Sequence, residues 1–462
     1  MLYPLRPTLP PTKAAPPLPR PERWRRRCGS FLFANLRKDL QHLDVYTLDP
    51  QGCKIIDDGF SLEPRVGGGI LLHVHVADPT CYFNPDDDVF DCAVTNGTSY
   101  YPSGRRARQM LDARVAAEAS LSGGTRRAVT VTYDFGPGNV LTRVECRMTV
   151  LRCDERFRLS YKDAGAALRA GHRVLRRACR LAAAIRQQQQ ADVLFGDMAH
   201  LSLSCPRVVK DNACDRVQLV RNGPHVVEVK KMVSVFAVAT NGNMARLLGA
   251  GPAPPPVVPA LLGGAGRTPY IHFTSPLRRA SDCVVHFELK NILAHTPGAV
   301  LRSDRAERAC PPPVFAEARA RVLVASARRA QTLSRKLQRL NIRTRFVQYI
   351  HQRLHTDGAR RVVLRFRCSR ASALRVRLLV CLLDGHSVRF LYDVYPGPGQ
   401  AVDPRQYRDT QEPRDGEDTQ TVHVTRCTQT ADRYGYGSLP QIDALFLVPK
   451  KNVPPKPTTT AT

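Results

Sequence analysis

The sequence predicts an α+β fold: a mixed β-sheet with packed helices, followed by a small β-barrel-like C-terminal domain. In the first half of the chain, strand-like runs alternate with turns and then give way to long helical patterns. After residue 359 the pattern changes to five short alternating strands, which suits a barrel of the OB type. Hydrophobic residues make up 43% of the 462 residues, so both domains can have packed cores.

The strands of the larger domain are predicted from apolar alternation and β-branched residues. Residues 43–83 alternate strand-like runs with turns, and Ile70–Ala77 (ILLHVHVA) is the strongest strand in this region. Ala128–Tyr133 and Val144–Val150 are predicted to pair as a hairpin.

Helical spacing of apolar residues begins at Asp163 and continues to Gln190. Val226–Val238 is predicted to pass from a strand into a helix. Residues 249–268, rich in Gly, Ala and Pro, are predicted to form a loop or lid. Ser275-Pro276 is predicted to begin a helix, with proline in its first turn. Residues 316–356 are helix-rich and basic.

Composition divides the chain into four segments. Residues 1–40 are rich in Pro and then in Arg, and predict a disordered tail. Residues 41–330 are predicted to form the larger domain, and residues 331–450 a basic helix followed by the β domain. Residues 451–462 form a Pro/Thr tail.

The net charge of +29 and the pI near 10.1 predict a polyanionic partner, with nucleic acid first among the candidates. Arginine supplies most of the cations, and its planar fork suits phosphate. The alternative is that an arginine-rich codon bias inflates the charge and no such partner exists.

The sequence contains no run of 18 apolar residues, so no membrane span is expected. The basic N-terminus also lacks the apolar core of a signal peptide, which predicts an intracellular protein, with cytoplasm and nucleus left open. The 14 cysteines are scattered without a CxxC pattern and are expected to be buried thiols rather than zinc ligands.

Two stretches carry opposite charges suited to phosphodiester chemistry. The first, residues 49–58, reads DPQGCKIIDD, and its Asp49, Asp57 and Asp58 can converge on one divalent ion. The second, residues 270–286, reads YIHFTSPLRRASDCVVH and places Arg278 and Arg279 just after a Ser-Pro turn, where they can face a phosphate.

Each polar pair also has a structural interpretation. Adjacent acids such as Asp57 and Asp58 are usually solvated. His73 and His75 lie on one face of a strand and are either metal ligands or hydrogen-bonded core histidines. Asp282 and His286 are spaced i, i+4 on the predicted helix, where a structural hydrogen bond is the commoner use.

The order of the motifs resembles the catalytic (RNB) domain of the ribonuclease II/R family. The series is TLD at 47–49, IIDD at 55–58, HVHVADPT at 73–80, NGTSYYP at 96–102, LSY at 159–161, FAVATNGNMA at 236–245 and YIHFTSPLRRASD at 270–282. The resemblance spans about residues 43–330, and HFTSPLRR is its most specific part.

The resemblance implies an RNB-type fold with an S1-like barrel after it, and a Mg²⁺-dependent 3′→5′ exoribonuclease. Such enzymes release nucleoside 5′-monophosphates from single-stranded RNA that enters a narrow channel. Asp49, Asp57 and Asp58 match three of the four aspartates that hold the metal, and Asp57 counts as catalytic with Arg278, which matches the arginine at the scissile phosphate. Tyr101 matches the tyrosine that stacks on the 3′-terminal base, and Arg279 matches a basic RNA-binding neighbour.

Three departures from the family pattern favour a divergent, truncated member. Ile55 stands where the family has its remaining aspartate, so one carboxylate is lost. Residues 249–268 replace a longer helical insert, and only about 40 residues precede the domain, too few for the N-terminal cold-shock barrels of the family. Two further hypotheses are therefore kept: an RNA-binding protein without turnover, and a scaffold that binds no nucleic acid. Protein partners are left open.

Overall fold

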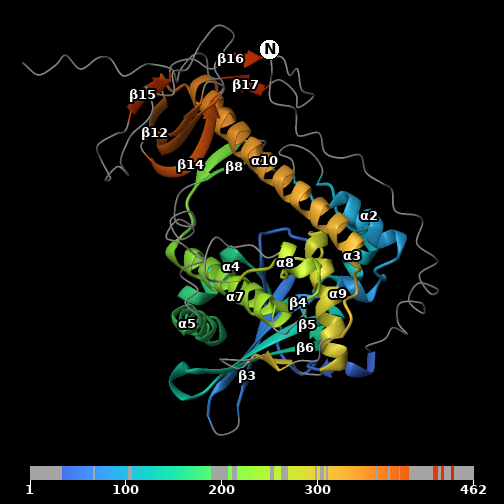
Figure 1. Ribbon diagram of the computed structural model, residues 1–462. Coiled ribbons are helices and arrows are strands. Elements are labelled where there is room, and N and C mark those ends of the chain that lie inside the picture. The colour runs from blue at the N-terminus through green and yellow to red at the C-terminus, as the bar shows by residue number, and fades with distance from the viewer. Residues whose placement is uncertain are drawn as a thin grey trace, which may run out of the picture.

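The computed structural model describes residues 34–65, 68–101, 107–188, 207–210, 216–249, 254–261, 269–296, 299–301, 306–307, 311–360, 362–372, 375–383, 386–394, 420–424, 428–430 and 439–441. Their main sheet has seven strands (Figure 1). In spatial order these are β11 (Ala306–Glu307), β10 (Ala299–Leu301), β6 (Leu141–Cys153), β5 (Gly124–Phe135), β4 (Ile70–Ala77) and β3 (Asp58–Pro64). The seventh, β1 (Lys38–Asp39), pairs in parallel with β6.

Alternation along β4 explains how the sheet forms. Leu72, Val74 and Val76 point to one face and are almost fully buried in the hydrophobic core. Strands β3 to β6 pair with their sequence neighbours in antiparallel register, as in the β5–β6 hairpin. The predicted strand at Ile70–Ala77 and the predicted hairpin are therefore confirmed.

The helices are α2 (Asp88–Asn96), α3 (Ala113–Ala119), α4 (Tyr161–Arg169), α5 (Arg173–Gln188), α7 (Pro224–Gly249), α8 (Val257–Leu261), α9 (Ala280–His295) and α10 (Glu317–His355). α7 packs on the sheet: the ring of Phe236 lies 5.6 Å from that of Phe60 on β3. The Thr240 and Tyr133 hydroxyls, on α7 and β5, are 3.1 Å apart. α9 is buried on nearly all sides, and its buried residues include the charged Asp282, Glu288 and Lys290.

A short parallel pair lies outside the main sheet. β2 (Thr47–Asp49) pairs with β7 (Arg158–Ser160), so Asp49 lies beside Ser160. Short 3₁₀ turns also occur among the described residues, at Ala34–Leu36, Pro79–Cys81, Pro137–Asn139 and Glu155–Phe157.

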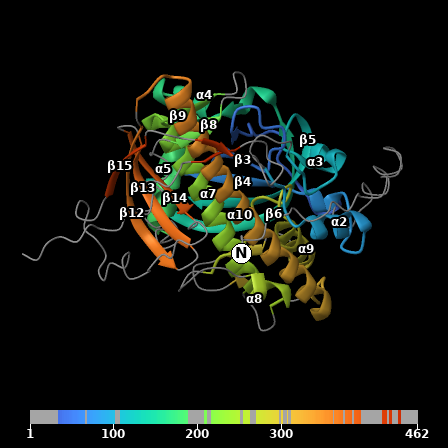
Figure 2. The same ribbon diagram turned by 90° about the horizontal axis from the view of Figure 1, so that it is seen from above.

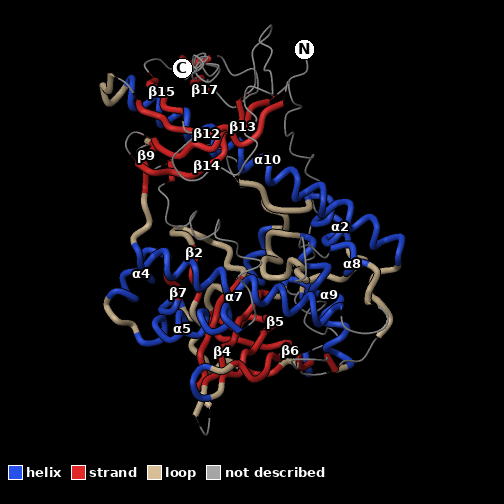
Figure 3. The backbone as a smooth tube through the Cα atoms, turned by 60° about the vertical axis from the view of Figure 1, so that its left-hand side comes forward, coloured by secondary structure: helices blue, strands red, loops and turns tan. Residues whose placement is uncertain are grey.

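α10 has 39 residues and extends from the helices near the main sheet to the C-terminal strands (Figures 1 and 2). Those strands form a separate antiparallel sheet in the order β14 (His386–Val394), β13 (Arg375–Leu383), β12 (Val362–Ser372) and β15 (Gln420–Val424). Figure 3 shows them at the far end of α10, together with the hairpin of β8 (Arg207–Lys210) and β9 (Val217–Val220).

The α+β architecture of the larger domain agrees with the prediction, and the structure refines the rest. β16 (Thr428–Thr430) and β17 (Leu439–Gln441) form a further two-stranded pair. The fifth predicted barrel strand begins at Ile442, outside the described residues, so the OB/S1-like barrel stays a prediction. The domain boundaries stay a prediction as well.

Two predicted helical segments differ from the structure. The helix predicted over residues 163–190 is two helices, because Gly171 adopts φ 95° between α4 and α5. The strand predicted at the start of Val226–Val238 is wrong, since this whole segment belongs to α7. Its valines favour a strand locally, but burial of Val229, Met232 and Phe236 along one helix decides the outcome.

Near the Ser-Pro turn, residues 275–279 form turns and a bridge, and α9 begins only at Ala280. The predicted loop at residues 249–268 contains α8, while residues 250–253 and 262–268 lie outside the described part. None of the described helices combines the length and apolarity needed to cross a membrane.

Candidate active site

The candidate site forms where the start of β3 meets the turn before α9. The Asp57 side chain is 9% exposed and accepts two hydrogen bonds from that turn. The Leu277 amide donates to Oδ1 at 2.9 Å, and Arg278 Nε donates to Oδ2 at 2.9 Å. On the β4 side, the Ala77 amide donates to the Asp57 carbonyl at 2.8 Å. Asp57 therefore links the sheet to a turn that lies more than 200 residues later.

The turn itself is built by its polar residues. Ser275 is held by Asp282, in the first turn of α9, whose Oδ2 accepts the Ser275 amide hydrogen at 2.9 Å. The Ser275 Oγ in turn accepts from Arg278 Nη2 at 2.9 Å. The Arg278 carbonyl accepts from the Ser99 amide at 2.9 Å and from Thr98 Oγ1 at 2.7 Å. Arg278 is thus oriented from both sides, while 48% of its side chain stays exposed.

Asp49 and Asp58 lie close to Asp57. Burial, followed by repulsion from Asp57, raises the pKa of Asp49 to about 6. Burial, followed by repulsion from Asp49 and Asp57, raises the pKa of Asp58 to about 7. Burial also raises the pKa of Asp57, although Arg278 opposes that rise. Three carboxylates that disfavour one another's ionisation form a region where a cation would be stabilised.

The oxygen donors of this site fit Mg²⁺ in a specific way. Within the described residues no group of three or more His, Cys, Asp or Glu side chains is arranged to hold a metal on its own. Mg²⁺, however, usually binds one or two carboxylates and completes its shell with water and substrate phosphate. An ionised carboxylate has about four lone-pair positions, so Asp57 can keep both of its hydrogen bonds and still offer an oxygen.

Ile55 stands where the resemblance to the ribonuclease II/R family implies a fourth aspartate. Its side chain is partly buried and packs against the hydrophobic core. The neighbouring Ile56 is fully buried, and its amide donates to Ser120 Oγ at 2.9 Å. The Cys53 thiol donates to the Ile55 carbonyl at 3.3 Å. The loop thus keeps its shape through apolar packing at a position that cannot contribute charge.

Tyr101 lies at the edge of the site. Its side chain is 51% exposed, an unusual state for a large aromatic residue. Burial of its hydroxyl raises the tyrosine pKa, which Arg278 lowers and Asp57 raises, so the three side chains are neighbours. The Tyr101 carbonyl accepts a hydrogen bond from Asn341 Nδ2 on α10 at 2.7 Å.

Arg279 differs from Arg278 in being engaged by protein groups. Its Nη2 lies 2.9 Å from Asp282 Oδ2, and its Nη1 lies 2.8 Å from His272 Nδ1. Its positive charge still lowers the pKa values of Asp57 and Asp58. Through these contacts Arg279 stabilises the turn. Direct RNA binding by Arg279 stays a prediction.

The remaining polar pairs have structural partners. His75 is bonded to Ser61 Oγ and Thr130 Oγ1, and His73 to Thr132 Oγ1 and Glu63. Both are therefore hydrogen-bonded core histidines.

The side chains of Asp282 and His286, both within the described residues, do not form the expected hydrogen bond with each other. The ring of His286 instead lies 3.3 Å from the Phe273 carbonyl.

Two residues of the site were not singled out from the sequence. Arg158 donates to the Cys53 carbonyl and lowers the pKa of Asp49. Tyr161 has a pKa raised by burial and then by Asp58 and Asp49, so its hydroxyl lies beside both acids. The LSY motif at 159–161 was the available signal, but only the β2–β7 pairing places it next to Asp49.

Known proteins resemble this chain in sequence and in fold. Residues 37–258 match the family model described as RNB domain. A 218-residue stretch is 28% identical to the exosome complex exonuclease RRP44 homolog A of Arabidopsis thaliana, and covers 46% of this chain and 22% of that protein. The matched stretch spans less than half the length of this relative. The same holds for two other curated proteins that this chain resembles, from Neurospora crassa and Synechocystis.

Two solved structures also share the fold. Mycoplasma genitalium RNase R, in complex with ribose methylated single-stranded RNA, has a TM-score of 0.57 at 14% identity, over 88% of this chain and 74% of the other. Yeast Ssd1, described as a pseudonuclease, has a TM-score of 0.52 at 14% identity, over 78% of this chain and 50% of the other. At these identities the likeness shows the fold alone.

Proposed function

Through the RNB domain at residues 37–258 this chain belongs to the RNB-domain family, and from that premise we propose that it is a 3′→5′ exoribonuclease. The proposed reaction is Mg²⁺-dependent hydrolysis of single-stranded RNA to nucleoside 5′-monophosphates. The observation that carries the proposal is the Asp57–Arg278 ion pair, with Asp49 and Asp58 beside it.

Each residue has a proposed role that follows from its environment. Asp49, Asp57 and Asp58 would hold Mg²⁺, one or two of them directly and the rest through its water; the ion when bound neutralises phosphate oxygens and lowers the pKa of water. Arg278 is fixed by Asp57 and Ser275 but half exposed, so it can donate to the scissile phosphate with little reorganisation. Tyr101 offers an exposed ring on which the terminal base can stack, a contact worth about 1–3 kcal/mol.

A second candidate function is RNA binding without turnover. Ile55 removes one carboxylate, and no closed group of metal ligands exists among the described residues. The likeness to a pseudonuclease supports this candidate too, since the same fold exists without the activity. It predicts salt-sensitive RNA binding, no turnover and no well-defined Mg²⁺ site.

A nuclease assay with matched variants separates the two functions. A 5′-labelled single-stranded RNA is incubated with Mg²⁺, and the wild type is expected to shorten it one nucleotide at a time. Asp57→Asn should lose at least a hundredfold in rate. Asp44→Asn, at an exposed carboxylate, serves as the control and should retain full activity. RNA binding by a wild-type protein that shows no shortening would favour the second candidate.

A further inference from the structure

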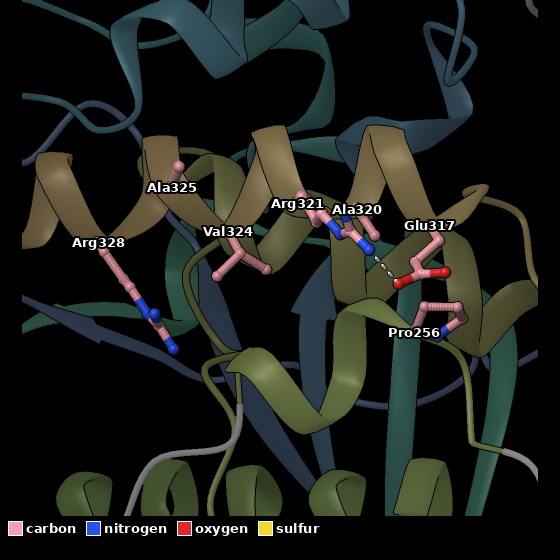
Figure 4. A pocket seen from close by; sticks show the side chains of 7 residues that line it. All are labelled: Pro256, Glu317, Ala320, Arg321, Val324, Ala325 and Arg328. Atoms are coloured by element: carbon pink, nitrogen blue, oxygen red, sulfur yellow. Dashed lines mark hydrogen bonds and ion pairs between the residues drawn. The ribbon is translucent and has the colours of Figure 1, made fainter.

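The first residues of α10 line a cavity of about 500 Å³ that opens next to α8 (Figure 4). Its wall combines apolar and basic side chains: Pro256, Ala320, Val324, Ala325, Arg321 and Arg328, with Glu317 at one end. Figure 4 shows Arg321 and Arg328 pointing to the side of α10 that faces α8. Both arginines are exposed.

Arg335 continues this row toward the candidate active site. Residues 321, 328 and 335 are seven positions apart, so successive side chains lie on nearly the same face, about 10.5 Å apart along the axis. Arg335 is exposed and close enough to His272 to lower the pKa of that histidine. His272 Nδ1 lies 2.8 Å from Arg279 Nη1, and Arg279 is next to Arg278.

α10 is also attached to the part of the site that would seat the RNA end. Asn341 Nδ2 donates a hydrogen bond to the Tyr101 carbonyl, and Ser326 Oγ donates one to the Val94 carbonyl on α2. Gly97, which follows α2, lies so close to Ala330 that a Cβ on residue 97 would overlap the Ala330 Cβ. The helix is therefore a fixed support that extends outward from the site, and its arginines keep a defined position relative to Tyr101.

We propose that Arg321, Arg328 and Arg335 form a phosphate-binding row that holds the single-stranded RNA upstream of its 3′ end. Arg335 would bind phosphates closest to the site, and Arg321 those farthest from it. The exposed Arg321–Glu317 ion pair, at 2.6 Å, contributes little and can be exchanged for a phosphate contact. This inference rests on RNA being the substrate, as proposed above, but it does not require turnover.

The row makes a quantitative prediction about salt. Each phosphate contact with single-stranded nucleic acid contributes about 0.7 to the slope of log K against log salt. The triple variant Arg321→Gln/Arg328→Gln/Arg335→Gln should therefore lower the slope by about 2. At low salt its affinity for a 20-nucleotide RNA should fall at least tenfold. Affinity for a four-nucleotide RNA, too short to reach Arg321 and Arg328, should fall much less.

The experiment is fluorescence anisotropy with labelled oligouridine in EDTA, so that no degradation occurs. The matched control is Arg173→Gln/Arg176→Gln/Arg180→Gln, which removes the same charge from the exposed side of α5. The charge-preserving variant Arg321→Lys/Arg328→Lys/Arg335→Lys should keep the wild-type salt slope, and melting curves verify folding.

The control distinguishes a specific row from general charge. Equal slopes and affinities for the two glutamine variants would overturn the inference, even where the nuclease proposal holds. A wild type that binds no RNA would overturn the inference and the proposed function together. An inactive protein with the predicted loss of salt slope would support the row and contradict only turnover.

Discussion

Arg278 Nε donates to Asp57 Oδ2 at 2.9 Å, which joins two charged residues that are 221 positions apart. Because Asp57 also accepts the Leu277 amide hydrogen, the carboxylate orients both the backbone and the guanidinium of the turn. The pair places a positive group next to three acids, and its geometry exists only in the folded chain.

The guanidinium of Arg278 is held by Asp57 and Ser275, so we predict that another positively charged side chain cannot replace it. Arg278→Lys cannot donate to both Asp57 and Ser275 and still face a phosphate, so kcat should fall at least a hundredfold, or about 2.7 kcal/mol. The melting temperature should change little, since the side chain is half exposed. Single-turnover kinetics on a short RNA provide the measurement. Arg156→Lys, at an exposed arginine in the turn before β7, is the matched substitution and should leave kcat unchanged.

The exposed ring of Tyr101 predicts a split between removing the ring and removing the hydroxyl. Tyr101→Ala should raise KM by about 5–150-fold, which corresponds to the loss of 1–3 kcal/mol of base stacking. Tyr101→Phe keeps the ring and should stay within about twofold of wild type. Steady-state kinetics on oligouridine measure both variants, and an equal effect of the two substitutions would rule out stacking.

Ile55 predicts a testable gain of metal affinity. Ile55→Asp adds a fourth carboxylate next to Asp49 and Asp57, so calorimetric titration should show tighter Mg²⁺ binding than in wild type. Ile55→Asn is the neutral control and should not tighten binding. Both variants lose apolar packing and should melt earlier by a similar amount. Identical Mg²⁺ isotherms for the two would show that position 55 lies outside the metal's reach.

Asp78 predicts a pH dependence of stability that is independent of the site. It is fully buried, and Arg37 Nη2 and Lys290 Nζ lie 2.6 and 3.2 Å from its carboxylate. Burial alone would raise its pKa, but Lys290 and Arg37 hold that pKa well below the usual range. A depressed folded-state pKa gives stability that is complete above the unfolded value of about 4 and is lost as pH falls through the folded value.

Asp78→Asn should therefore lower the free energy of unfolding by about 3–5 kcal/mol at pH 7, because two cations are left without their counterion. Urea unfolding at several pH values measures the effect. The difference from wild type should persist between pH 5 and 8 and shrink only in strong acid. A difference that vanished at pH 6 would contradict the assignment to Asp78.

Much of the fold follows from local patterns. β4 begins and ends at the predicted residues because alternation and β-branched side chains agree with its place in the sheet. The segment at Val226–Val238 could not be predicted in this way, because its valines favour a strand and only packing against Phe60 and the sheet makes it helical. The break at Gly171 was equally hidden, since apolar spacing continues through it.

Residues of the candidate site could be predicted from the sequence only where they belong to a recognisable motif. Asp57 and Arg278 stood out as residues, yet their contact depends on a turn that packs across the sheet. Arg158 and Tyr161 reach the acids through the β2–β7 pairing, which spacing alone does not reveal. Arg279 belongs to a recognisable motif, but the motif does not reveal that this arginine forms an ion pair with Asp282.

The proposed activity requires Asp49, Asp57, Asp58 and Arg278 to act together on the 3′ end of RNA. Its most direct test is the release of labelled nucleoside 5′-monophosphate from a 3′-labelled single-stranded RNA, measured with Mg²⁺ and with EDTA. The proposed activity predicts mononucleotide release by the wild type that depends on Mg²⁺ and is abolished by Asp57→Asn. Equal release by wild type and Asp57→Asn, or no release by a folded wild type in Mg²⁺, would contradict it.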